Sequence, residues 1–118
     1  MNFPRKIPKA PKRASRWRSQ AHLAHVRRHE CSMCGVAGPI EAAHVRIGSG
    51  AGVGQKPDDW RCVSLCGTME GCHHRQHTVG EAEFWKGRDV EALIEFFIRT
   101  SPRRAEIEQA RKERGHAS

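Results

Sequence analysis

Cysteines constrain the fold of this chain more than any other residue type. Cys31 and Cys34 are separated by two residues, and Cys66 and Cys72 are separated by five. A two-residue gap lets two thiolates from one turn bind the same ion, and tetrahedral Zn²⁺ accepts four sulfur ligands. We therefore predict a structural zinc site on these four cysteines, with a tight knuckle at the first pair and a longer turn over residues 67–71.

The fifth cysteine leaves one alternative open, because Cys62 could serve as the fourth ligand. It lies in the middle of an expected strand, so we predict that it is a buried free thiol. A chain of 118 residues with 37% hydrophobic residues buries only a thin core, which favours a metal as an additional staple. No signal-like or membrane-spanning apolar run occurs, so we expect a cytoplasmic protein, in which clustered cysteines bind metal more often than they form disulfides.

The net charge of +8 is concentrated near the N-terminus. Residues 1–29 contain nine Lys or Arg and no acid, whereas the other 89 residues carry 12 basic and 13 acidic side chains. Basic arms bind nucleic acids by displacing counterions, although a solubilising tail is the alternative. The residues predicted to bind DNA are Arg5, Lys6, Lys9, Lys12, Arg13, Arg16, Arg18 and Lys56.

Three segments are expected: a disordered basic arm over 1–14, a domain over 15–100, and a charged tail over 101–118 that forms a frayed helix. Apolar periodicity and turn residues predict the elements of the domain, and a glycine-rich loop connects its two strands. The expected elements are a helix capped by Ser15 and ending near His29, strands over 40–47 and 60–65, a short helix after Cys72, and a helix over 89–100 capped by Asp89.

Three histidines form the second candidate site. His73 and His77 are four residues apart, so on a helix both rings project from nearly the same face and can bind one metal ion. His44 lies on the strand that should precede this helix in space. Histidine pairs at this spacing also occur on solvated helix faces, so the pair gains weight from the adjacent Cys72, whose metal would fix the first turn of the helix.

The order of a strand histidine, a hairpin and a histidine-bearing helix resembles the ββα-metal arrangement of HNH endonucleases. The residues that carry the resemblance are Ala-Ala-His-Val (42–45), Leu-Cys (65–66) and Cys-His-His-Arg-Gln-His (72–77). The stretch from about Arg18 to Trp85, including the linker over 45–59, is similar to phage-encoded HNH nucleases of the recombination-enhancement (Ref) type. The implied fold is α+β, a small ββα-metal domain with a four-cysteine zinc knuckle and flanking helices.

The resemblance implies a metal-dependent endonuclease that hydrolyses DNA in phage or prophage DNA processing. His44 would be the general base, and His73 and His77 would bind a catalytic divalent cation (Mg²⁺, Mn²⁺, Ni²⁺ or Zn²⁺). Ala43 stands where many such sites have another metal ligand, and Asp59 is the candidate for the residue that braces the loop. His44 as a metal ligand is the alternative to its role as base.

The implied partners are DNA and a further phage protein such as a recombinase, while the oligomeric state is left open. A non-catalytic zinc-ribbon DNA-binding protein is the competing function, but it leaves the three histidines without a role. Further side chains are expected outside the site. His74 should face away from the metal, the histidines of the first helix should lie on a polar or DNA-facing surface, and Trp60 and Trp85 should belong to the core.

Overall fold

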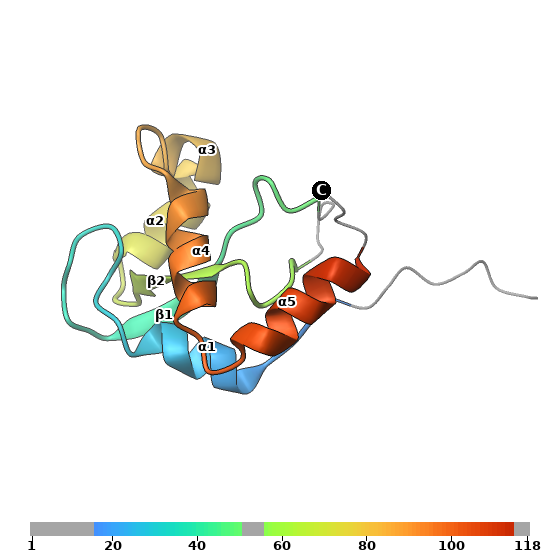
Figure 1. Cartoon of the computed structure of the whole chain (residues 1–118). Coiled ribbons are helices and arrows are strands. Elements are labelled where there is room, and N and C mark those ends of the chain that lie inside the picture. Colours follow the sequence, from blue (N-terminus) through green and yellow to red (C-terminus); the bar gives the residue numbers. More distant parts are fainter. Residues whose placement is uncertain (1–15, 51–55, 115–118) are drawn as a thin grey trace, which may run out of the picture.

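The computed structural model describes residues 16–50 and 56–114, so the predicted basic arm over 1–14 lies outside the described residues. The elements confirm a small α+β architecture: a two-stranded sheet surrounded by helices (Figure 1). No helix within these ranges has both the length and the apolar character needed to cross a membrane. In chain order the elements are α1 (Gln20–Arg27), β1 (Ile40–His44), β2 (Cys62–Cys66), α2 (Cys72–Val79), α3 (Glu81–Phe84), α4 (Val90–Arg99) and α5 (Arg104–Glu113).

The two strands form the predicted antiparallel hairpin. Ile40 lies opposite Cys66, and His44 lies opposite Cys62. All five residues of β2 are buried, because α1, α2 and α4 all pack against this strand, whereas β1 is partly exposed. The hairpin therefore places His44 at the open end of the sheet, next to the long connection between the strands.

Both strands are shorter than predicted at this open end. The backbone amides of Arg46 and Ile47 bond to the carboxylate of Glu81 instead of a neighbouring strand. On the other side, the amide of Arg61 bonds to the carbonyl oxygen of Asp58 in a turn. The amide of Val45 still bonds to the carbonyl oxygen of Arg61 at 2.8 Å, and beyond it side-chain and turn contacts replace the ladder. Alternation of hydrophobic residues in the sequence does not indicate where this change occurs.

Helix α1 begins later than predicted, and its cap is Ser19 rather than Ser15. The hydroxyl of Ser19 accepts a hydrogen bond from the amide of His22 at 3.1 Å. Two carboxylates hold the preceding backbone outside the helix: Asp58 accepts from the amide of Trp17 at 2.7 Å, and Asp59 accepts from the amide of Ser19 at 2.8 Å. The helix starts where these bonds end.

Helix α4 supplies the apolar face that covers β2, as its periodicity predicts. Asp89 caps the helix by accepting from the amide of Ala92 at 3.0 Å. Trp60 and Trp85 are buried beside this core, as predicted, and the indole nitrogen of Trp85 donates to Gln76 of α2 at 2.7 Å. The buried residues of α4 are Val90, Ile94, Phe97 and Ile98.

Helix α5 belongs to the same packed structure and is not a frayed tail. Ile107 is fully buried, Arg111 pairs with Glu95 of α4, and Arg114 makes two hydrogen bonds to Asp58. In Figure 1, α2 and α3 lie near the N-terminal end of α4, and α5 turns away from its C-terminal end. The C-terminal helix therefore contacts the segment that precedes β2.

Candidate active site and metal centre

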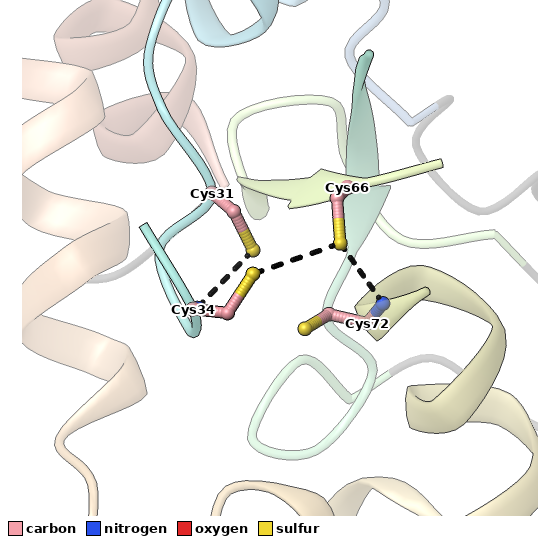
Figure 2. A group of neighbouring side chains, drawn as sticks. All are labelled: Cys31, Cys34, Cys66 and Cys72. Atoms are coloured by element: carbon pink, nitrogen blue, oxygen red, sulfur yellow. Dashed lines mark hydrogen bonds between the residues drawn. The ribbon is translucent and has the colours of Figure 1, made fainter. Parts of the chain in front are cut away.

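Four cysteines converge on one point of the fold. The sulfur atoms of Cys31, Cys34, Cys66 and Cys72 all lie within 4.8 Å of one another. Figure 2 shows the side chains pointing toward one another from the turn after α1, the end of β2 and the start of α2. The structure thus brings together the four residues predicted from their spacing, and this cluster could hold a structural metal.

The one sulfur–sulfur distance that the structure defines closely suits a tetrahedral ion. Sulfur atoms bound to one ion at about 2.3 Å lie about 3.8 Å apart in a tetrahedron, and the sulfurs of Cys34 and Cys66 are 3.9 Å apart. Burial alone would raise the pKa of the Cys31 thiol, but backbone hydrogen bonds outweigh it and lower the pKa to about 7. Burial raises the pKa of the Cys72 thiol well above its ordinary value, so the closeness of the four sulfurs, and not their acidity, supports a metal site.

Cys62 lies outside this cluster. It is fully buried in β2, and its burial raises the pKa of the thiol well above the ordinary value. Its sulfur is not among the four that lie within 4.8 Å of one another. The structure therefore resolves the alternative ligand in favour of Cys66 and Cys72.

A separate cavity of about 520 Å³ contains the predicted histidines. It opens between β1, the start of α3, α2 and the segment that precedes β2. His44 enters it from the strand, while His73 and His77 enter it from the helix. Its lining residues are Leu23, Ala42, His44, Arg46, Lys56, Pro57, His73, His77 and Glu81.

His44 is held at the cavity by Asp59. Its Nε2 donates to Oδ1 of Asp59 at 2.9 Å, and the same carboxylate accepts from Arg18 and from the amide of Ser19. Burial alone would raise the pKa of Asp59, but these three hydrogen bonds hold it below its usual value. The ionised carboxylate fixes the ring of His44 and leaves Nδ1 as the nitrogen that can accept a proton.

His73 and His77 lie side by side on α2, with ring centres 5.0 Å apart. With metal–nitrogen bonds of about 2.1 Å, two imidazoles at 90–109° around one ion have ring centres about 4.5–5.2 Å apart. Nδ1 of His73 also donates to Glu41 of β1 at 2.6 Å, which leaves Nε2 as the nitrogen that can bind a metal. This carboxylate–histidine arrangement commonly orients metal-binding histidines.

The cavity does not contain a preassembled three-ligand metal site. Across residues 16–50 and 56–114, the cysteines are the only group of three or more potential ligands whose donor atoms lie this close together. Ala43 is fully buried on the opposite face of β1, so a ligand at that position would point into the core. Within these residues, His73 and His77 thus have no third potential ligand as close as the cysteines are to one another.

Comparison with known families adds one result. A family model described as a protein of unknown function (DUF968) matches residues 2–101. The chain belongs to the DUF968 family. No curated protein and no solved structure matches it.

The matched region of this DUF968 protein contains all four clustered cysteines and the three cavity histidines. It ends at Ser101, between α4 and α5. The contacts that α5 makes with Asp58 and Glu95 therefore join a helix outside the match to the matched domain.

Of the residues predicted to bind DNA, the structure describes only Arg16, Arg18 and Lys56. The basic residues numbered 5 to 13 lie outside the described residues. Arg16 lies near Asp58 at 3.6 Å, and Arg18 donates to Asp59 and to the carbonyl oxygens of Pro57 and Lys56. Arg18 thus braces the base of the histidine cavity, while Lys56 lines it.

The histidines of α1 differ from the prediction. His22 is fully buried and its Nδ1 bonds to Ser101 at 2.8 Å, so a DNA-facing position is wrong for this residue. The ring of His25 bonds to Thr100, and His29 packs edge-on against Phe97. These histidines thus connect α1 and the residue that follows it to α4 and its C-terminal end.

His74 is exposed and is not among the cavity residues, as predicted. Arg61, at the start of the second predicted strand, pairs with Glu91 and bonds to the carbonyl oxygens of Val45 and Ile47. It therefore holds the start of the connection between the strands, and it does not line the histidine cavity.

Two acidic residues of the site were not predicted from the sequence. Glu41 lies three positions before His44 on β1 and contacts His73, and Glu81 follows His77 by four residues and lines the cavity. The spacing of Glu81 was a usable signal, although Gly80 interrupts the helix between them. Glu41 gave no local signal, because its partner lies 32 residues away.

Proposed function

We propose that this protein is a metal-dependent endonuclease of the HNH type that hydrolyses phosphodiester bonds of DNA. The observation that carries the proposal is the position of His44, which faces the His73–His77 pair across one cavity while Asp59 holds its Nε2. The chain order of β1, β2 and α2 is the ββα order from which the resemblance was drawn, and β1 and α2 line the cavity.

His44 is the proposed general base. Its Nδ1 accepts a proton from a water molecule as the water oxygen forms a bond to phosphorus, and the bond from phosphorus to the 3′ oxygen breaks. Asp59 keeps the proton on Nε2 and stabilises the imidazolium that forms. The resemblance implies products with 5′-phosphate and 3′-hydroxyl ends.

His73 and His77 are the proposed ligands of the divalent cation. Such an ion supplies positive charge to the phosphate and to the departing oxygen. Glu41 holds the proton of His73 on Nδ1 and so keeps Nε2 available for the ion. With two protein ligands, we expect weak binding of the ion before DNA arrives.

The cysteine cluster is the proposed zinc site, with a structural role. Four thiolates fill a tetrahedral coordination sphere and leave no position for water. Cys66 ends β2 and Cys72 begins α2, so one ion on the cluster fixes the helix that carries His73 and His77 relative to the sheet that carries His44. Zinc would thus hold the two halves of the active site in register.

Nicking of supercoiled plasmid tests the proposal. We expect cleavage with Mg²⁺, Mn²⁺ or Ni²⁺ that a chelator stops. His44→Ala should reduce the rate about 10²–10⁴-fold, the usual cost of a lost general base, and added metal should not restore it. His77→Ala should also lose activity, but excess divalent ion should partly restore it because the ligand set, and not the base, is damaged.

His74→Ala is the matched control, because this histidine is on the same helix but is exposed and outside the cavity. It should cleave like the unmodified protein. Rescue of His44→Ala by Mn²⁺, without rescue of His77→Ala, would reverse the two roles. Full activity of His44→Ala would refute the HNH mechanism, and DNA binding without any cleavage would favour the non-catalytic zinc-ribbon function.

A further inference from the structure

A second cavity, of about 300 Å³, lies beyond the histidine cavity and is rich in arginine. Arginines reach it from three separate parts of the chain: the segment before α1, the residue before β2, and α5. The turn over 48–50 forms another wall. Its lining residues are Arg16, Gly48, Ser49, Gly50, Asp58, Trp60, Arg61, Arg111 and Arg114.

Two of these arginines are fixed by carboxylates. Arg114 makes two hydrogen bonds of 2.8 Å to Asp58, and its guanidinium lies 5.3 Å from the ring centre of Trp60. Arg61 is bound by Glu91 and by two backbone carbonyl oxygens. They form rigid walls whose positive charge Asp58 and Glu91 largely balance, and their side chains lose little further freedom when a ligand binds.

The other two arginines are less constrained. Within the described ranges, the structure records one ion pair for Arg16, to Asp58 at 3.6 Å. Arg111 pairs with Glu95 at 2.8 Å, and about a third of its side chain is exposed. The cavity and its surroundings contain four arginines and the three carboxylates Asp58, Glu91 and Glu95, so their net charge is +1.

We propose that this cavity binds a phosphate group of the DNA strand that the histidine cavity cleaves. Guanidinium groups suit phosphate, because two N–H groups can bond to two of its oxygens. The turn at Gly48 has a φ of +79°, which favours glycine, and a Cβ there would lie 2.9 Å from the carboxylate of Glu91, so the close packing of this wall against Glu91 also requires glycine.

The same two chain segments line both cavities, which links the new site to the proposed active site. In the first segment, Arg46 lines the histidine cavity and Gly48 lines the arginine cavity. In the second segment, Pro57 lines the histidine cavity and Asp58 lines the arginine cavity. A backbone that crosses these segments meets both cavities, so the arginine cavity would position the strand. This inference rests on the proposed nuclease function.

Fluorescence anisotropy with a labelled DNA duplex tests the site, without added divalent cation and from 50 to 200 mM NaCl. Arg16→Gln and Arg111→Gln should each raise Kd by about 3- to 10-fold. The slope of log affinity against log salt should become shallower by about 0.9 for each phosphate that the variant no longer binds. Cleavage at DNA concentrations below Kd should slow along with the loss of affinity, because fewer protein molecules then hold a strand.

Arg104→Gln is the matched control. It makes the same change on α5, where Arg104 pairs with Glu108 at 2.9 Å and lines neither cavity. It should leave affinity and salt slope nearly unchanged. Equal effects of Arg104→Gln and Arg111→Gln would overturn the proposal in favour of a general charge effect, and unchanged binding by Arg16→Gln and Arg111→Gln would overturn it directly.

Two further outcomes separate this inference from others. The two cavity variants could bind DNA more weakly while the unmodified protein shows no cleavage with any divalent metal. That result would support the arginine cavity and refute the nuclease proposal. Binding of inorganic phosphate that Arg111→Gln abolishes, with unchanged DNA binding, would assign the cavity to a small phosphorylated ligand and overturn the proposal for DNA.

Discussion

Replacing Asp59 by Asn removes a buried negative charge while keeping the shape of the side chain. Asp59 accepts hydrogen bonds from the amide of Ser19, from His44 and from Arg18 at 2.8, 2.9 and 3.0 Å. The amide oxygen of Asn can still accept from Ser19. Its NH2 group then takes the place of the oxygen that accepted from His44 and Arg18, and because it cannot accept a hydrogen bond, these two bonds are lost. A hydrogen bond to a charged group contributes about 1.5 kcal/mol.

The bond to Arg18 should contribute less, about 0.5 kcal/mol, because 45% of that side chain is exposed and water screens the pair. The bond to His44 keeps its full value, since His44 is mostly buried. We therefore expect Asp59→Asn to lower the free energy of unfolding by about 2 kcal/mol. With a urea dependence of about 1–2 kcal/mol per M, the midpoint should fall by about 1–2 M.

Urea unfolding with zinc held constant measures this change. Asp89→Asn is the control, because Asp89 caps α4 through one hydrogen bond to Ala92 and Asn caps helices about as well as Asp. Its midpoint should hardly move. A midpoint of Asp59→Asn equal to that of the unmodified protein would refute the argument that this carboxylate joins α1, β1 and the segment before β2.

The same substitution has a consequence for catalysis under the proposed function. Without the carboxylate, the proton of His44 is no longer held on Nε2, so less of the ring has Nδ1 free to act as the base. Cleavage at saturating DNA should fall by about 10²–10⁴-fold, with little change in DNA affinity. A rise in KM with an unchanged kcat would instead assign Asp59 to DNA binding.

The remaining predictions concern cysteine and histidine. Cys72→Ser should lose bound zinc and unfold, because metal binding in small domains supplies folding energy, whereas Cys62→Ala should keep its zinc; the opposite zinc contents would refute the ligand set. Burial, followed by the nearby charge of His25, lowers the pKa of His22 to about 4 from 6.5. Between these two pH values, His22 is protonated in the unfolded chain but not in the folded chain. The free energy of unfolding should therefore fall by up to roughly 3 kcal/mol as pH falls from about 6.5 to 4. Urea unfolding at several pH values measures the difference in free energy of unfolding between the unmodified protein and His22→Gln. This difference should become smaller over that pH range, and a constant difference would contradict the low pKa of His22.

The sequence by itself determined the features that depend on short spacing. The two-residue gap between Cys31 and Cys34 lets the thiolates of one turn bind the same ion, and the four-residue gap between His73 and His77 places both rings on one helix face. The apolar periodicity of 90–98 and the cap at Asp89 likewise predict α4, because a helix repeats its environment every three to four residues.

Only the tertiary structure decided which charged groups surround the site. Arg18 and Asp59 meet although they are 41 positions apart in the chain, and His73 meets Glu41 at a separation of 32. The burial of His22 depends on α4, and the arginine cavity depends on the return of α5 to Asp58. Periodicity says which face of an element is apolar, but contacts between distant polar residues depend on how whole elements pack, and no local pattern records that packing.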